Sequence, residues 1–298
     1  MRNTILSFLL AGFALQAQEG RISGPVAATF FDEATSSVRA INGVPGAGYL
    51  SEALASADSA AVSPDGRYVL LSAQQRIVSI DLAGGATQFV SEGEASKIAW
   101  SADSAAAAFV RNGSLNLWKR DGNLLREVGA APASVTRMAV DAAAEAVFTA
   151  AANGIARHHD GEAAMVLAPV ADAAGLVLSA DGKSLYTVSR SEHQVLEIDA
   201  HNGGAGLFAR DAANPVGVAL TRDGSLLVAD AESRSVLRYS RSSRALLATL
   251  ELSFSPARLD TIGDGVYLLN QRSKQEPLEV VAVQPSLAAF FVPAPQEN

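Results

Sequence analysis

The chain has 298 residues, a formal net charge of −8 and no cysteine. The absence of cysteine excludes a small fold held together by disulfides, and the mild acidity argues against a nucleic acid or an anionic membrane as the main partner. At this length a chain buries about three quarters of the surface that it exposes when unfolded, so it can be stable without cross-links.

The first 17 residues have the pattern of a secretory signal peptide. Arg2 is followed by an apolar run from Ile5 to Leu15 and then by small residues. The run has about half of the roughly 20 residues that a membrane-spanning helix needs. We therefore expect cleavage after Ala17, export to the periplasm or the exterior, and no integral membrane domain. An uncleaved N-terminal anchor is the alternative.

Residues 18–56 predict a pair of short strands and a connector. The strands run from Val26 to Phe31 and from Ser37 to Ile41, and a loop rich in Gly and Pro follows them. An exposed sheet edge invites aggregation, so we expect this pair to pack against another sheet of the chain.

Residues 57–293 repeat a unit of about 40 residues. Its clearest copy, Asn214 to Ser240, contains three strands with a tight turn between the first two, and a fourth strand follows. The corresponding turns begin at Ser63, Ser101, Asp141, Ser179, Thr221 and Ile262, and their third residues lie 38 to 42 residues apart. Four strands at this period are typical of a β-propeller blade. We predict an all-β propeller of about six four-stranded blades, with seven as the alternative, and a tail at 294–298. Because a propeller must latch its first blade to its last, we expect the N-terminal strand pair to pack on or beside the last blade as a latch, completing a sixth blade or forming part of a seventh.

The repeats resemble three known types of propeller repeat. VALTRDGSLLVADAESRSVLRYS (218–240) is similar to the NHL repeat, and VLSADGKSLYTVSRSEHQVLEIDAHNG (177–203) resembles the repeat named after its Tyr-Val-Thr-Asn strand, YVTN. VSPDGRYVLLSA (62–73) and IAWSADSAAAAFV (98–110) look like the TolB-type repeat. The resemblance implies a propeller and leaves the activity open, because such blades carry scaffolds, ligand binders and enzymes.

An enzymatic alternative is a metal-dependent, lactonase-like hydrolase or a lyase with its site at the channel mouth. Such a site needs His, Asp or Glu side chains that converge from several blades. His158 and His159 are adjacent, so on a strand they point to opposite sides, while His193 and His201 lie in loops. We interpret all four as surface residues and name no catalytic residue, metal ligand or cofactor. A divalent metal belongs to the alternative only.

Loops between the second and third strands carry side chains of both charges, on the face where propellers usually bind ligands. The turn carboxylates, such as Asp65, are interpreted as structural. A rim of mixed charge suits a protein, a peptide or a small polar ligand. The sequence therefore favours an exported, monomeric and non-catalytic binding or scaffolding module. Its candidate ligand-binding residues are Arg111, Asn153, Arg190, Glu192, Asp230, Glu232, Arg234, Asn270 and Arg272.

Overall fold

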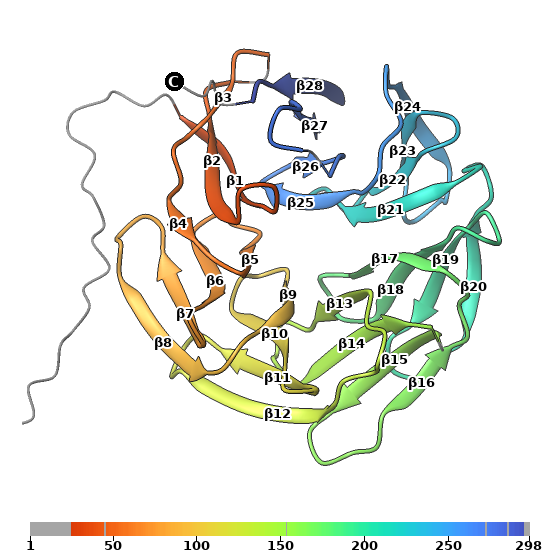
Figure 1. Ribbon diagram of the computed structural model, residues 1–298. Coiled ribbons are helices and arrows are strands. Elements are labelled where there is room, and N and C mark those ends of the chain that lie inside the picture. Colours follow the sequence, from red (N-terminus) through yellow and green to blue (C-terminus); the bar gives the residue numbers. More distant parts are fainter. Residues whose placement is uncertain (1–24, 45, 153, 272, 285, 295–298) are drawn as a thin grey trace, which may run out of the picture.

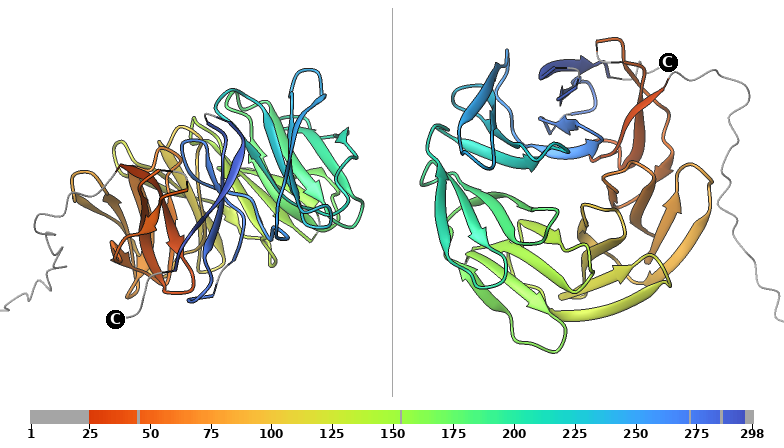
Figure 2. Two further views of the ribbon diagram at one scale, coloured as in Figure 1. Left: turned by 90° about the horizontal axis from the view of Figure 1, so that it is seen from above. Right: turned by 180° about the vertical axis from the view of Figure 1, so that it is seen from behind.

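The computed structural model describes residues 25–294, except residues 45, 153, 272 and 285. The described chain forms seven antiparallel sheets arranged around a central axis as a β-propeller (Figures 1 and 2). The all-β propeller is confirmed, with the seven blades of the alternative instead of six. The predicted signal peptide lies outside the described residues. Within them, no helix is present that could span a membrane.

Blades 2 to 7 share one design, in which the four strands follow one another from the centre outward (Figure 1). All residues of β22 (Leu226–Asp230), a second strand, are buried, which explains its continuous apolar run. The outermost strands face solvent, and in β24 (Leu246–Glu251) no residue is buried.

The strands of blades 2, 3 and 4 follow one another without long insertions. Blade 2 consists of β5 (Ser59–Val62), β6 (Tyr68–Ala73), β7 (Arg76–Asp81) and β8 (Thr87–Glu92). Blade 3 consists of β9 (Ser96–Trp100), β10 (Ala106–Arg111), β11 (Ser114–Lys119) and β12 (Leu124–Ala130). Blade 4 consists of β13 (Arg137–Val140), β14 (Ala146–Ala151), β15 (Gly154–His159) and β16 (Met165–Ala168).

Blades 5, 6 and 7 continue the same pattern to the C-terminal end of the described chain. Blade 5 consists of β17 (Ala173–Leu178), β18 (Ser184–Ser189), β19 (Gln194–Asp199) and β20 (Ala205–Ala209). Blade 6 contains β21 (Pro215–Leu220), β22, β23 (Ser235–Tyr239) and β24. Blade 7 consists of β25 (Asp260–Gly263), β26 (Val266–Leu268), β27 (Leu278–Ala282) and β28 (Ala288–Val292).

These six blades present two different faces. The turns between first and second strands lie on one face, here called the turn face, and the loops between second and third strands lie on the other, the loop face. In blade 2, the Ser63 hydroxyl donates to the Asp65 carboxylate, which accepts the Arg67 amide at 3.0 Å. The same hydroxyl-to-carboxylate bond recurs from Ser101 to Asp103, from Ser179 to Asp181 and from Thr221 to Asp223.

Blade 1 is built differently from the other six. β1 (Val26–Asp32) pairs with β2 (Ser37–Asn42), and the other side of β2 pairs with two short strands, β3 (Tyr49–Leu50) and β4 (Ala55–Ser56). β3 and β4 together take the place of a third strand that is interrupted at residues 51–54. β1 is the innermost strand and packs between β25 and β5.

The direction of β1 is opposite to that of the inner strands beside it. Gly263, the last residue of β25, lies against Ala27 at the start of β1. Arg258, which precedes β25, forms an ion pair with Glu33, which follows β1. The inner strands of blades 3 and 4, by contrast, are joined by a parallel bridge. The hairpin turn of blade 1, residues 33–36, therefore lies on the loop face.

The predicted packing of the N-terminal strand pair beside the last blade is confirmed, because β1 packs against β25. The pair forms part of a seventh blade and does not complete a sixth: within the described residues, the last blade takes all its strands from β25 to β28, and the strand pair belongs to a blade of its own. The physical reason is local pairing. β1 and β2 form a hairpin across a short turn, which costs less loop-closure entropy than pairing with a strand at the other end of the chain. The chain crosses blade 1 three times, through β1, β2 and the interrupted third strand. It therefore leaves blade 1 at the loop face, where β5 begins.

The ring closes between blades 7 and 1 through side chains. Phe30 and Ile41 of blade 1 share one buried cluster with Leu268, Val280 and Val292 of blade 7. Residues from opposite ends of the chain thus form a common core. Apolar burial at this seam takes the role that hydrogen bonds of a shared strand would have.

Candidate functional site

The described candidate residues lie on the loop face, in four of the seven blades. They are Arg111 in blade 3, Arg190 and Glu192 in blade 5, Asp230, Glu232 and Arg234 in blade 6, and Asn270 in blade 7. The other two candidates, Asn153 and Arg272, lie outside the described residues. Among the described candidates, no hydrogen bond or ion pair joins two residues of different blades.

Asp230 is fully buried and holds two loops together. Its carboxylate accepts the backbone amides of Ala213 at 2.7 Å and Asn214 at 2.9 Å, in the connection from blade 5 to blade 6. It also accepts the amides of Glu232 at 3.1 Å and Ser233 at 3.4 Å. Burial alone raises the pKa of Asp230, but these hydrogen bonds lower it more, so the pKa lies below its ordinary value. Asp230 is therefore a charged positioning residue beneath the surface.

Two of the three described arginine candidates, Arg190 and Arg111, are held by side-chain partners on the loop face. Arg190 binds both oxygens of Asp172, at N–O distances of 3.1 and 2.6 Å, and this hydrogen-bonded carboxylate raises the pKa of Arg190. Arg111 donates to Asn116 Oδ1 at 3.0 Å and to the Ser91 hydroxyl of the neighbouring blade. Both guanidinium groups thus stiffen the loops around them.

Asn270 closes the long loop of blade 7 on itself. Its Nδ2 donates to the Pro277 carbonyl at 2.9 Å, and its Oδ1 accepts the Glu279 amide at 2.9 Å. The side chain thereby bridges the two ends of the loop. The role that the structure gives Asn270 is to shape this loop.

One residue, Ala213, connects the loops of blades 5 and 6. His193 Nδ1 contacts its carbonyl oxygen, and its amide donates to Asp230. The sequence offers no signal for Ala213, because a contact through the backbone leaves no motif. The exposed candidate side chains on the two connected loops, here called the blade 5–6 surface, are Arg190, Glu192, Glu232 and Arg234.

A small crevice of about 20 Å³ lies on the loop face between blades 7 and 1. Glu33 on its rim accepts hydrogen bonds from Arg258 at 3.3 Å and from Gln271 at 2.9 Å. Burial lowers the pKa of Arg258, but the carboxylates of Asp260 and Glu33 raise it more, so the pKa lies above its ordinary value. The crevice is below the roughly 300–1,000 Å³ of small-molecule pockets.

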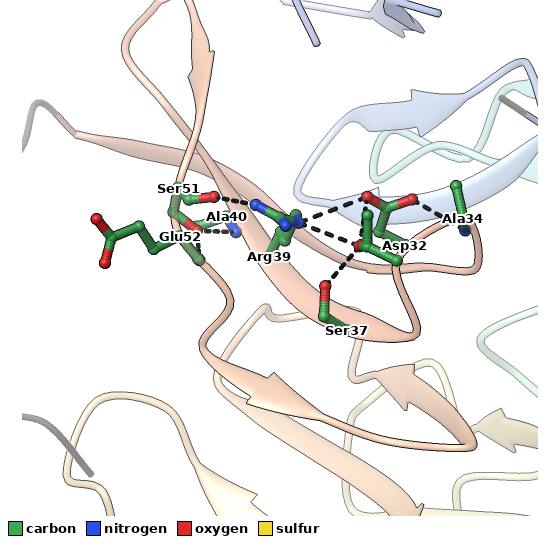
Figure 3. A network of polar contacts seen from close by, with 8 residues as sticks. Asp32, Ala34, Ser37, Arg39, Ala40, Ser51 and Glu52 are labelled. Carbon is green, nitrogen blue, oxygen red and sulfur yellow. Dashed lines mark hydrogen bonds and ion pairs between the residues drawn. The ribbon is translucent and has the colours of Figure 1, made fainter. Parts of the chain in front are cut away.

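A polar network beside this crevice holds the hairpin of blade 1 (Figure 3). Arg39 donates to the Ser51 carbonyl at 2.7 Å, and its Nε lies 3.5 Å from the Asp32 carboxylate. Asp32 in turn accepts the Ala34 amide at 3.2 Å. The network joins β1 and β2 to the interrupted third strand, so it fixes the segment that places Glu33 on the loop face.

The histidines differ from the prediction in one case. His158 is buried, with 3% of its surface exposed, and its Nε2 lies 2.9 Å from Thr149 Oγ1. Burial lowers the pKa of His158, because the charged imidazolium loses its hydration. The prediction of a surface residue fails there because the neighbouring blade covers that side of β15. Among the described residues, no three His, Asp or Glu side chains converge as metal ligands would.

No model of a known protein family matches this chain, and no curated protein sequence does. Solved structures match its fold. The β-propeller domain of Cps50 (Swd1) from Myceliophteria thermophila superimposes with a TM-score of 0.61 at 15% identity, covering 81% of this chain and 88% of that one. A functionally unknown protein from Desulfotomaculum acetoxidans DSM 771 gives 0.61 at 11% identity, covering 90% and 95%.

Virginiamycin B lyase from Staphylococcus aureus is a further match, with a TM-score of 0.54 at 14% identity, covering 78% of this chain and 82% of that one. At these identities the likeness shows the propeller fold alone. It supports the fold implied by the repeats, and it does not assign the chain to the NHL, YVTN or TolB type.

Proposed function

We propose that the protein is an exported, non-catalytic binding or scaffolding module that holds a protein or peptide segment at the blade 5–6 surface. The observation that carries this proposal is the linked anchoring of the two loops. The Asp230 carboxylate accepts hydrogen bonds from four backbone amides, one of which is that of Ala213. The carbonyl oxygen of Ala213 contacts His193 in the loop of blade 5, so the two loops are joined. Loops that are ordered in advance lose less entropy on binding, so they favour recognition.

The charges of this surface indicate the kind of ligand. Glu192 and Glu232 are acidic and Arg234 is basic, and all three are exposed. Arg190 is already paired with Asp172, at an N–O distance of 2.6 Å. A polar segment with charges of both signs complements such a surface better than a polyanion. We therefore take a peptide or protein loop as the ligand class.

The second candidate function, a metal-dependent hydrolase or lyase, has less support from the geometry. Two aspartates that adjoin Glu192 and Glu232 of the blade 5–6 surface are already engaged, Asp230 by backbone amides and Asp172 by Arg190. A metal ion would have to displace these bonds to use either aspartate as a ligand. Thermal unfolding with chelator, Ca²⁺ or Zn²⁺ separates the two functions, because an ion at a hundred times its dissociation constant stabilises the native state by about 2.7 kcal/mol. A clear upward shift would favour the enzyme.

The binding proposal is tested by selecting random peptides on the immobilised mature protein. Selected peptides are then measured against a charge swap on the loop face, Glu232→Lys with Arg234→Glu. The matched control is a charge swap on the turn face, Lys183→Glu with Asp121→Lys. We expect the loop-face swap to weaken the selected peptides at least about tenfold, or 1.4 kcal/mol, and the control to leave them unchanged. Peptides that bind both variants equally would contradict the proposed surface.

Export is tested separately on the N-terminal segment. We expect the chain to be recovered outside the cytoplasm with a new N-terminus at Gln18, which mass spectrometry of the intact protein detects. A full-length chain that remains in the cytoplasm would contradict export.

A further inference from the structure

The turn of blade 4 arranges its hydrogen bonds differently from other turns of the repeat. In blades 2, 3 and 5, a Ser at the first position and an Asp at the third position share the two amides that follow the turn. In blade 4, Asp141 stands at the first position and accepts both amides, from Glu145 at 2.8 Å and Ala146 at 3.0 Å. Neither of these amides is left for the residue at the third position to bind, and that residue is an alanine, Ala143.

A hollow of about 170 Å³ lies beside this turn, between blades 3 and 4 on the turn face. It lies where β11 and β12 meet the turn that joins β13 to β14. The volume is below the roughly 300–1,000 Å³ of drug-sized small-molecule sites, so the hollow has room only for a small ligand. Leu117 and Leu124 give the hollow an apolar side, and Leu124 is 58% exposed although it is a large apolar residue.

The charged residues that border the hollow are mostly basic. Lys119 and Arg126 reach it from blade 3, against the single carboxylate of Glu145. Arg126 donates to the Ala144 carbonyl, and its NH1 lies 3.7 Å from Asp160. Lys119 is exposed, and no ion pair to it is formed within the described part of the chain. The carboxylate that other turns hold at their third position is missing beside these two cations.

We propose that this hollow binds a small organic anion in which one carboxylate is attached to a short apolar chain. The carboxylate accepts hydrogen bonds from Lys119 and takes the place that Ala143 leaves vacant. The apolar chain lies against Leu117 and Leu124. Charge-assisted hydrogen bonds supply the polar part of the affinity, and apolar burial supplies the rest. The site is on the face opposite the blade 5–6 surface, so it stands independently of the proposed function.

Hexanoate is the probe for this site, followed by amide and methyl NMR shifts of the purified mature protein. Hexanamide and hexylammonium have the same chain length and are the matched ligands without a negative charge. We expect saturable shifts at the turn that contains Ala143 and Ala144 with hexanoate only. An absence of saturable shifts there, or equal binding of hexanamide, would overturn the proposal.

Two variants and one control complete the test. Lys119→Gln is expected to weaken hexanoate binding about fivefold, equivalent to about 1 kcal/mol for a single exposed charge. Ala143→Asp fills the hollow with a fixed carboxylate and is expected to lower the affinity more than tenfold. Lys183→Gln, a cation of the same face beside the complete turn of blade 5, leaves the affinity unchanged. The proposal is wrong if Lys119→Gln and Lys183→Gln bind hexanoate equally, with both spectra showing a folded protein.

Discussion

Blade 1 belongs to the same ring as the six blades after it, but its innermost strand runs in the direction opposite to the innermost strands of those blades. In blades 2 to 7, the first strand starts at the loop face and the chain crosses the blade four times. In blade 1, β1 starts at the turn face, and three crossings suffice because β3 and β4 share one pass. The contrast teaches that a propeller blade is specified by its packing surfaces, while the direction of its strands follows from where the chain must enter and leave.

The two kinds of blade also differ in what holds them to their neighbours. Where blades 6 and 7 meet, Gly217 allows β21 to approach the Leu259 backbone so closely that a Cβ would lie 2.6 Å from its nitrogen. Where blades 7 and 1 meet, the corresponding approach of Gly263 to the Ala27 carbonyl is wider, at 3.0 Å. The seam with blade 1 therefore depends more on side chains, and the following variants test that difference.

The largest effect is expected from Phe30→Ala in the core of the closing seam. Phe30 is 3% exposed, and truncation of a buried Phe costs about 3–5 kcal/mol of unfolding free energy. Denaturant unfolding measures the loss. Phe291→Ala is the control, because Phe291 is 47% exposed on the outermost strand and should cost no more than about 1 kcal/mol. Equal losses of unfolding free energy for the two variants would show that the burial of Phe30 does not stabilise the contact between blades 7 and 1.

Arg39→Ala is expected to cost about 3 kcal/mol, because it removes an ion pair with the buried Asp32 carboxylate and the hydrogen bond to the Ser51 carbonyl. The side chain of Asp32 is only 2% exposed. The comparison variant is Arg222→Ala, whose ion pair with Asp264 is largely exposed and should contribute less than about 1 kcal/mol. Chemical unfolding of both variants gives the two values. A loss for Arg39→Ala as small as that for Arg222→Ala would contradict a structural role of the network in Figure 3.

Paired glycine variants compare the two seams directly. Gly217→Ala is expected to destabilise by about 3 kcal/mol, because the new methyl group meets rigid backbone, and Gly263→Ala by about 1 kcal/mol. Melting temperature and denaturant midpoint report both effects. The reverse order would show that the closing seam is the tighter of the two.

The smallest effect is expected from pH, through His158 in blade 4. The pKa of His158 is lowered from its ordinary value of 6.5, so below that pH the unfolded chain binds more protons than the folded one. Stability should therefore fall as the pH drops below about 6.5 and stay constant above it. Unfolding of the wild type and of His158→Gln at pH 7.5 and 5.5 measures this. A slope that persists in the variant would assign the effect to another group.

Much of the candidate site could be placed on the loop face from the sequence, because loops between second and third strands alternate regularly with the turns. The tasks of individual residues could not be assigned in the same way. Asp230 and Asn270 resemble exposed loop residues in the sequence, yet each binds backbone groups of segments that only the folded chain brings near. His158 was placed at the surface because the blade that covers β15 lies elsewhere in the chain.

The sequence by itself determined the repeat, the strand order within blades 2 to 7 and the structural role of the turn carboxylates, because hairpins and turns form between residues close together in the chain. Tertiary structure alone decided that there are seven blades, that β1 runs in the opposite direction and that the ring closes without a shared strand. The physical reason is that closure depends on burying Phe30 against Val280 and Val292, which come from the other end of the chain. No local pattern reports such a contact.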